Sequence, residues 1–405
     1  MNRREQFDEA TQPPPRIKAT VAVLTFHRPE QIRETVRQLL AQALAAPRWC
    51  EVDVLVVDND PVGTGRDAVE ALGRGGVRCV VEPTPGISAG RNRALDECQS
   101  AGRDVLLFMD DDGRPGSNWV VSMLKRWRQT KSAAVAGWVD TRYLGEPSPW
   151  ILAGGFFERR RFDDGVERPA AACGNLLLDL HQVGSLRFAR SLGLSGGEDT
   201  LFTRMLVARG GRIVFARDAV VVDQVAVDRV TRRWVKLRQL SQGNSAGLMD
   251  LYLRPGVGRR AKIVAGGTVR MLAGAVKACV GVATHDLKKD ARGWRMASRG
   301  AGMALAGLGL SWNEYSREGR RLVCAPRIKV EPARVRRAGQ AGAAEPDAGC
   351  QRIDGVGGVP GADGAWGAHS WGVSGVGHVN AGNNAGSNAG NDAGNSAAAS
   401  QEQAE

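Results

Sequence analysis

A short apolar run that ends in three consecutive aspartates constrains this chain most strongly. Val105–Met109 has the length and composition of a buried β-strand, and Asp110, Asp111 and Asp112 follow it directly. The carboxyl end of a strand in an open α/β sheet faces the crevice in which such sheets bind ligands. Carboxylates at that tip suit Mg²⁺ or Mn²⁺, which prefer oxygen ligands and share them with phosphates. A solvated acidic turn is the alternative, because aspartate and glycine are ordinary turn residues.

Four further apolar runs, each followed by polar residues, have the pattern of strands in the same sheet. They are Ala19–Phe26, Val52–Val57, Val77–Val81 and Ala133–Val139. Apolar residues at helical spacing follow the first run from Pro29, and the helix after the third run is expected to end near Gln99. Strands that alternate with helices indicate an α/β fold with a mostly parallel sheet and helices on its faces.

Polar side chains at the ends of parallel strands meet at one edge of a sheet. We therefore expect Thr25, Asp58 and Arg91 to lie near the three aspartates, although they are far apart in the sequence. Two of them also have an ordinary structural explanation. Asp58 is suited to a turn or a cap, and Arg91 is a surface arginine by default.

A second acidic pair begins another predicted helix. Glu198 and Asp199 follow the flexible pair Gly196 and Gly197 and precede an amphipathic run that ends near Arg209. Acidic residues in a first helical turn are favoured by the helix dipole, which is the structural explanation. A carboxylate placed after two glycines is also suited to remove a proton from an acceptor hydroxyl.

Between about Ala19 and Asn244 the chain resembles the inverting family 2 glycosyltransferases, which have the GT-A fold. The resemblance rests on the order and spacing of five motifs: Thr25-Phe-His-Arg28, Asp58-Asn-Asp60, Gly86-Ile-Ser-Ala-Gly-Arg-Asn92, Asp110-Asp-Asp112 and Gly197-Glu-Asp199. It implies a nucleotide-sugar donor, a saccharide or lipid-linked acceptor, and a divalent Mn²⁺ or Mg²⁺ ion. It also implies a role in bacterial cell-surface polysaccharide or glycolipid biosynthesis.

The resemblance implies which residues bind the donor. Thr25, Arg28 and Asp58 would hold the nucleoside, and Arg91 would approach the diphosphate. The alternative enzyme is a sugar-1-phosphate nucleotidyltransferase, which also combines an α/β sheet with Mg²⁺. That class is expected to have a glycine-rich loop with a basic residue directly after the first strand, and the segment from Thr25 to Arg28 contains no glycine.

The resemblance also implies the metal ligands and the base. Asp110 would contact the ribose or the metal, Asp111 the donor, and Asp112 the metal. Asp199 would deprotonate the acceptor hydroxyl as it attacks the anomeric carbon, with Glu198 as the alternative base. The reaction would be a single displacement in which the metal and an arginine stabilise the departing nucleoside diphosphate.

Two positions depart from the family pattern. Many members have a histidine after the strand that follows the base helix, whereas this chain has Asp223 and then Gln224. Processive members carry Gln-x-x-Arg-Trp, and Val230 stands where that glutamine would be, so a processive polymer synthase is disfavoured. The residues that remain candidates for the diphosphate or acceptor side are Asp223, Arg232, Arg233 and Trp234.

Positive charge is concentrated in the last part of the chain. Residues 228–337 contain 24 Lys and Arg against 7 Asp and Glu, a net charge of +17, while the whole chain carries +12. A basic tract beside a neutral-to-acidic catalytic layer indicates an anionic surface as partner rather than a basic active site. The sequence has no nucleic-acid recognition motif, so we expect no nucleic-acid partner.

The apolar segment at 263–283 is interrupted by Arg270 and Lys277, so no run reaches the roughly 20 uncharged residues of a spanning helix. Aromatic residues and methionines among basic residues predict helices that lie in the membrane interface. We therefore expect a cytoplasmic enzyme that is peripheral on the inner face of the cell membrane. Helices that only pack on the catalytic domain, and a non-catalytic peripheral membrane-binding protein, are the alternatives.

The chain is expected to have four parts. These are a flexible lead over 1–16, a GT-A catalytic domain over 17–246, a basic helical membrane-associating region over 247–330, and a disordered tail rich in Gly, Ala and Asn over 338–405. The lead has no apolar signal-peptide core. The seven cysteines include no Cys-x-x-Cys pair, which fits a reduced cytosolic setting and does not fit a zinc site.

Overall fold

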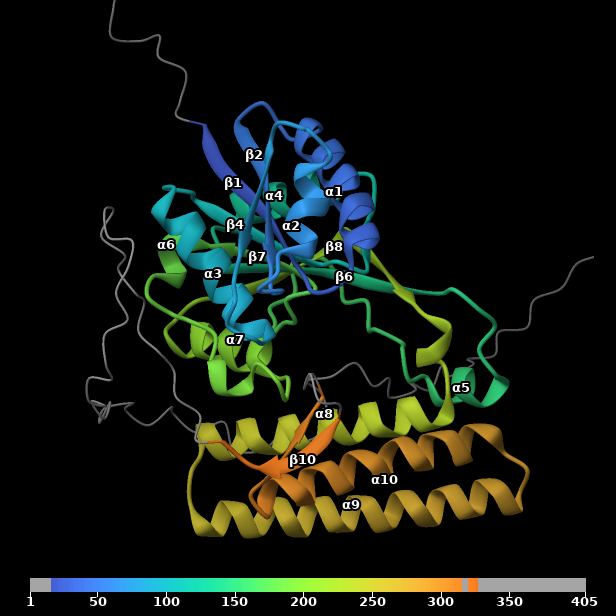
Figure 1. Cartoon of the computed structure of the whole chain (residues 1–405). Coiled ribbons are helices and arrows are strands. Elements are labelled where there is room, and N and C mark those ends of the chain that lie inside the picture. Colours follow the sequence, from blue (N-terminus) through green and yellow to red (C-terminus); the bar gives the residue numbers. More distant parts are fainter. Residues whose placement is uncertain (1–15, 315–319, 327–405) are drawn as a thin grey trace, which may run out of the picture. The chain divides into compact units, whose positions relative to one another are not determined.

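A computed structural model describes residues 16–314 and 320–326. The flexible lead, apart from residue 16, and the tail predicted from residue 338 lie outside the described residues. The main element is an eight-stranded sheet with the strand order β3-β2-β1-β4-β7-β6-β8-β5 (Figure 1). Three long helices and a two-stranded sheet, β10-β9, follow it in the chain.

The strands of the large sheet are β1 (Ile17–Thr25), β2 (Cys50–Asp58), β3 (Val77–Val81), β4 (Val105–Asp110), β5 (Gly113–Pro115), β6 (Ala134–Tyr143), β7 (Asn175–Asp179) and β8 (Ile213–Val225). The helices that accompany them are α1 (Pro29–Leu44), α2 (Thr64–Glu70), α3 (Ile87–Ser100), α4 (Trp119–Thr130), α5 (Pro149–Gly154), α6 (Leu180–Val183) and α7 (Glu198–Ala208). The last part comprises α8 (Arg232–Leu253), α9 (Val257–Ala283), α10 (Leu287–Gly307), β9 (Leu310–Asn313) and β10 (Arg321–Cys324). Two short 3₁₀ helices are η1 (Arg190–Leu192) and η2 (Val227–Arg229).

The sheet is mixed and mostly parallel, which confirms the predicted fold class. Strands β3, β2, β1 and β4 are parallel neighbours, and β6 is parallel to β8. Strand β7 is antiparallel to β4 and β6, and β5 is antiparallel to β8. All five predicted strands are present. The sequence did not predict β5, which has three residues, or β7, in which only three apolar residues stand between Asn175 and Asp179.

The central strands are buried on both faces, which explains their continuous apolar composition. On β1, Val21 and Val23 belong to a core cluster with residues of α1 and α4, among them Trp119. The intervening Ala22 belongs to the opposite cluster, which includes Leu95 of α3 and Phe202 of α7. Helices on both faces therefore fix the sheet, and its carboxyl edge remains for the loops that carry the site.

Helix α10 packs against both α8 and α9 (Figure 1). Glycines make these contacts unusually close. A Cβ atom at Gly274 of α9 would collide with the backbone of Ala297 of α10, and one at Gly302 of α10 would collide with the Leu240 carbonyl of α8. Because α8 continues without a break from residue 232 to residue 253, the boundary predicted between 246 and 247 falls inside a helix.

Helix α9 has an exposed apolar face on the side away from these contacts. The exposed side chains include Val269 (67% exposed), Leu272 (57%) and Val276 (64%). Among the described residues, α9 is the one helix that is long and apolar enough to cross a membrane by length and composition. The presence of Arg270 and Lys277 therefore does not exclude α9 from the helices that could span a membrane by length and composition, although the sequence analysis used it for that purpose.

The glycine contacts generate a test on two positions of the same helix. Gly274→Ala should destabilise the protein by about 1–3 kcal/mol, because the added methyl group forces α9 and α10 apart. Gly266→Ala is the matched control. It has open space around its Cβ position and should be neutral or stabilising by up to about 1 kcal/mol, the difference in helix propensity. Chemical unfolding measures both changes, and equal effects would contradict the close packing.

Candidate active site

A cavity of about 900 Å³ opens at the carboxyl edge of the sheet. Its walls come from the ends of β1, β4 and β8, from the segment after α5, and from α8 and α10. The strand register produces this convergence, since Thr25 pairs with Asp58 and Leu24 pairs with Asp110. The sequence-predicted residues that line the cavity are Thr25, Arg28, Asp110, Asp111, Asp112, Asp223 and Trp234.

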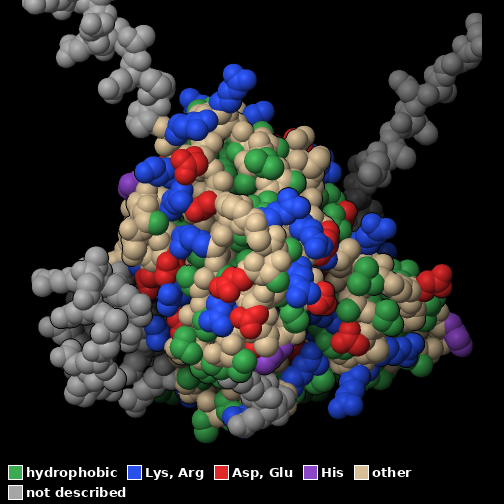
Figure 2. Space-filling view, turned by 45° about the horizontal axis from the view of Figure 1, so that its top comes forward, with side chains coloured by type: hydrophobic (Ala, Val, Ile, Leu, Met, Phe, Trp, Pro, Cys, Tyr) green, Lys and Arg blue, Asp and Glu red, His purple; other side chains and the backbone are tan. Residues whose placement is uncertain are grey.

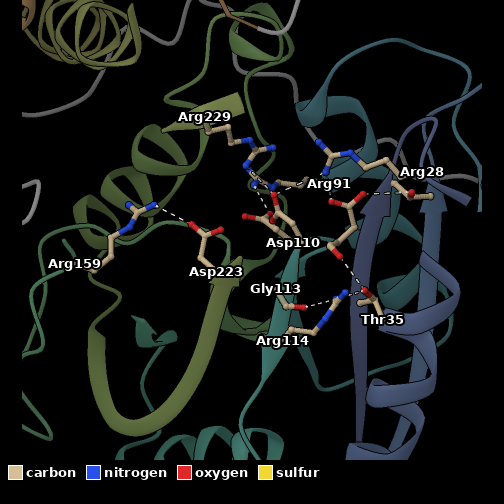
Figure 3. Close-up of polar contacts among 12 residues, drawn as sticks. Arg28, Thr35, Arg91, Asp110, Gly113, Arg114, Arg159, Asp223 and Arg229 are labelled. Carbon is tan, nitrogen blue, oxygen red and sulfur yellow. Dashed lines mark hydrogen bonds and ion pairs between the residues drawn. The ribbon is translucent and has the colours of Figure 1, made fainter. Parts of the chain in front are cut away.

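Asp111 holds the acidic triplet in place. Arg28 donates a hydrogen bond from Nη1 to Asp111 Oδ1 at 2.7 Å, and Thr25 Oγ1 donates to Oδ2 at 3.5 Å. The backbone carbonyl of Asp111 accepts a hydrogen bond from Thr35 on α1 at 2.9 Å (Figure 3). Burial raises the pKa of the Asp111 carboxyl, and Arg28 opposes this effect. The middle aspartate therefore anchors the turn, and its neighbours face the cavity.

Three carboxylates, those of Asp110, Asp112 and Asp223, line the cavity. Figure 3 shows Asp110 and Asp223 among them. Asp223 on β8 pairs in register with Gly113, directly after the triplet. The side chain of Asp110 is 54% exposed, and it lines the cavity. Burial, together with Asp112, Asp111 and Asp223, raises its pKa to about 7. Burial and Asp112 also raise the pKa of Asp223.

Arginines offset part of this negative charge. Arg229 Nη1 lies 3.1 Å from Asp112 Oδ2, and Arg159 Nη2 lies 3.9 Å from Asp223 Oδ2. The described residues contain no group of three or more His, Cys, Asp or Glu side chains that is already arranged to hold a metal ion. The oxygen donors of Asp110, Asp112 and Asp223 nevertheless match the preference of Mg²⁺ or Mn²⁺.

Arg91 lies behind the cavity wall. Its guanidinium forms an ion pair with Glu198, and the two side chains are each only 5% exposed. Its Nη2 lies 3.8 Å from Asp110 Oδ1. These contacts link the start of α7 to the end of β4, and the approach of Arg91 to a diphosphate stays a prediction. The surface role considered as an alternative is wrong.

The two acidic residues at the start of α7 have different surroundings. Glu198 is buried against Arg91, burial raises its pKa to about 7, and its Oε2 has no hydrogen-bond partner among the described residues. Asp199 is half-buried and accepts hydrogen bonds from the backbone N–H (2.6 Å) and hydroxyl (3.3 Å) of Thr200. Thr200 lines the cavity, which places this helical turn at its rim. The accessible carboxylate is that of Asp199.

Asp58 is fully buried and does not line the cavity. Its two oxygens accept hydrogen bonds from the backbone N–H groups of Asp60 (3.1 Å) and Arg66 (2.9 Å), which fixes the start of α2. The next residue, Asn59, lines the cavity and accepts a hydrogen bond from Gly86 N at 2.9 Å. The sequence analysis missed Asn59, although it stands in the middle of the quoted Asp58-Asn-Asp60 motif.

At the other end of the cavity, Trp234 on α8 stacks on Phe157 with a centroid distance of 5.8 Å. Arg232 and Arg233 are exposed and do not line the cavity. Other arginines from the basic tract do line it: Arg229, Arg238, Arg295, Arg299 and Arg320. The expectation that this tract serves an outer surface rather than the active site is therefore wrong for these residues, which helix packing brings into the cavity.

Residues 20–179 match the family described as Glycosyl transferase family 2. Over 232 residues the chain is 34% identical to the succinoglycan biosynthesis protein ExoM of Rhizobium meliloti (strain 1021), which covers 56% of this chain and 73% of that protein. The chain belongs to glycosyl transferase family 2. This membership confirms the predicted family and makes the chain a nucleotide-sugar glycosyltransferase rather than the nucleotidyltransferase or the non-catalytic protein considered as alternatives.

Solved structures similar to this glycosyltransferase include three with bound nucleotides or nucleotide-sugars. GalNAc-T7 with UDP, GalNAc and Mn²⁺ is 12% identical, with a TM-score of 0.41 over 58% of this chain and about half (51%) of its own. Mannosyltransferase PcManGT from Pyrobaculum calidifontis, with GDP-Man and Mn²⁺, is 17% identical, with a TM-score of 0.48 over 75% of this chain and 91% of its own. S. aureus TarS 1–349 with UDP-GlcNAc is 14% identical, with a TM-score of 0.43 over 77% of this chain and 100% of its own.

The buried pair of Arg91 and Glu198 generates a stability prediction. Glu198→Ala should lower the free energy of unfolding by about 3–5 kcal/mol, because it leaves the Arg91 charge buried without its partner. Glu30→Ala, which removes the exposed partner of Arg33 on α1, is the control and should cost less than about 1 kcal/mol. Denaturant titration compares the two. A small effect at Glu198 would mean that the pair is not a structural link.

Proposed function

We propose that this glycosyltransferase moves a sugar from a nucleoside diphosphate to an acceptor hydroxyl by a metal-assisted, inverting displacement. The observation that carries the proposal is the gathering of the Asp110, Asp112 and Asp223 carboxylates in one cavity with the start of α7 at its rim. The donor's diphosphate is proposed to lie at the carboxylates, and the acceptor between them and Trp234.

Asp110, Asp112 and Asp223 are the residues that would hold the divalent ion. Burial and then the neighbouring carboxylates raise the pKa values of Asp110 and Asp223, and a bound cation would relieve the repulsion between the carboxylates. When bound, Mn²⁺ or Mg²⁺ supplies positive charge that stabilises a departing nucleoside diphosphate. Arg229 and Arg28 already lie beside Asp112 and would add to this stabilisation.

Asp199 is proposed as the base that takes the proton from the acceptor hydroxyl. Asp199 does not itself line the cavity, but it belongs to the same helical turn as Thr200, which does, and it is less buried than Glu198. Glu198 is the positioning residue, since its pair with Arg91 ties this turn to the strand that carries Asp110. Asn59, Thr25 and Arg28 line the part of the cavity proposed for the nucleoside.

The biological role that we propose is the synthesis of a bacterial cell-surface polysaccharide or glycolipid. The support is the 34% identity to a protein named for succinoglycan biosynthesis.

We further propose that the enzyme works while attached to the inner face of the cell membrane through α9. Basic residues flank the exposed apolar face of this helix: Arg259, Arg260 and Lys262 at its start, and Lys288 and Lys289 after its end. An apolar face between basic ends is typical of a helix that lies in the interface of an anionic bilayer. On the face in Figure 2, by contrast, acidic side chains lie among the basic ones.

The metal proposal is tested by thermal shift with a panel of nucleotides and nucleotide-sugars in the presence of Mn²⁺. One nucleoside class should stabilise the native protein, because a ligand that binds only the folded state raises its stability. Asp112→Asn should abolish the Mn²⁺-dependent part of that shift, since an amide is a weaker ligand for a hard cation. Asp163→Asn, at an exposed carboxylate outside the cavity, should keep it. Full Mn²⁺ dependence in Asp112→Asn would remove the metal assignment.

The base is tested with the donor that the panel identifies. Asp199→Asn should lower turnover by roughly 10² or more and leave donor affinity within a few-fold, because general base catalysis typically contributes 10²–10⁴. Turnover and donor binding are measured separately. An equal loss of donor binding would make Asp199 structural.

Membrane attachment is tested by sedimentation with lipid vesicles. The full chain should sediment with anionic vesicles and not with neutral ones, and salt should weaken the attachment. The double variant Val269→Asp/Val276→Asp should stay in solution, whereas Val62→Asp, at a similarly exposed valine after β2, should sediment like the wild type. Attachment that resists both salt and carbonate would instead indicate a spanning helix.

A further inference from the structure

The helix side of the cavity carries a cluster of arginines that the proposed reaction does not use. Arg295 and Arg299 are on α10, one helical turn apart, and Arg238 is on the facing helix α8. All three line the same cavity as the acidic triplet. They come from elements that follow the donor-binding part of the chain, so they form a separate wall.

Arg299 has no acidic neighbour that offsets its charge among the described residues. Neither Arg295 nor Arg299 forms an ion pair there, although the Glu158 carboxylate lies near Arg295 and opposes the fall in its pKa that burial causes. The Nε atom of each arginine is buried without a hydrogen-bond partner. Burial, followed by the neighbouring Arg295 and Arg270, lowers the pKa of Arg299 to about 9. Positive charges that are withdrawn from water and placed side by side are costly unless an anion joins them.

Neutral groups hold the guanidinium groups in fixed positions. Arg299 Nη2 donates a hydrogen bond to Gln242 Oε1 at 2.6 Å. Arg295 Nη1 donates to the carbonyl oxygens of Gly154 (3.0 Å) and Gly155 (2.8 Å) at the end of α5. These contacts orient both side chains, and the charge of Arg299 stays without an acidic neighbour, which is the arrangement of a preformed anion site.

This wall lies between the proposed metal site and helix α9. Arg238 and Asp223 line the same cavity, so this wall adjoins the proposed metal site. On its other side, α10 packs along α9, the helix with the exposed apolar face. Trp234 and Phe157, stacked beside the arginines in the same cavity, offer an apolar surface for a sugar ring or an isoprenoid chain.

We propose that Arg238, Arg295 and Arg299 form an acceptor subsite that binds the diphosphate of a lipid-linked saccharide acceptor. The proposal rests on the proposed function, because it assigns the acceptor for the same cavity. Guanidinium groups bind phosphate oxygens through paired hydrogen bonds, and a diphosphate esterified at both ends offers them one negative charge on each phosphate. The apolar face of α9 would keep the lipid of such an acceptor close to the cavity.

The test uses the full chain and three probes. Farnesyl diphosphate represents a lipid-linked diphosphate, inorganic diphosphate represents the same anion without a lipid, and the nucleoside diphosphate selected by thermal shift reports the donor site with Mn²⁺. Arg299→Gln should weaken farnesyl diphosphate binding at least about tenfold, because hydrogen bonds to charged groups are strong. Binding of the nucleoside diphosphate should change less than about twofold.

Two further variants separate the anion site from general effects on folding. Arg292→Gln changes an arginine of the same helix that does not line the cavity, and it should bind farnesyl diphosphate like the wild type. Arg299→Lys keeps a positive charge but loses the planar pair of donors, so its affinity should lie between those of the wild type and Arg299→Gln. Unfolding curves establish that each variant is folded before binding is compared.

The outcomes distinguish this proposal from the one on which it rests. If farnesyl diphosphate binds Arg299→Gln as it binds the wild type, the subsite is wrong while the donor site stands. If Arg299→Gln loses the nucleoside diphosphate as well, the arginines belong to the donor site and the acceptor assignment is wrong. Equal affinity for inorganic and farnesyl diphosphate overturns the lipid-linked source. If the wild type binds no nucleoside diphosphate with Mn²⁺, the proposed function fails.

Discussion

The structure depends on like-charged carboxylates that are brought together at one edge of a sheet. Parallel pairing of β1 with β2 and β4 places their polar ends side by side, and β8 adds Asp223 opposite the residue after the triplet. Such a cluster is unfavourable unless positive charge accompanies it. Arg28 and Arg229 lie against it from the cavity, and Arg91 lies behind it. A divalent cation would complete the compensation that these side chains begin.

The arginines of the basic tract at residues 228–337 give the helices after the catalytic sheet a part in the cavity. Their chain positions suggest an outer basic surface, but α8 and α10 turn Arg238, Arg295 and Arg299 toward the cavity. The glycines between α8, α10 and α9 allow the three helices to approach closely. The same helices thus close the acceptor side of the cavity and present the apolar face of α9 outside it.

The sequence was most informative where a signal is local. The runs around β1–β4 and the acidic triplet predicted both the sheet and the carboxylates of the cavity. Roles that depend on which way a side chain points were not predictable. Arg91 and Glu198 are 107 residues apart in the sequence, but their side chains form a buried contact. Asn59, rather than Asp58, lines the cavity. Arg229, Arg295 and Arg299 belong to no recognisable sequence motif, because they reach the cavity only through the packing of the last part of the chain.

The central claim is that the Asp110, Asp112 and Asp223 carboxylates hold the cation that accompanies the donor. Crystals grown with Mn²⁺ and the nucleoside diphosphate, with diffraction measured at the manganese absorption edge, locate that ion directly. We expect one anomalous peak between these carboxylates and the diphosphate, at about the 2.0–2.2 Å oxygen distances of small divalent ions. An ordered diphosphate in the cavity with no anomalous peak at the three carboxylates would contradict the account.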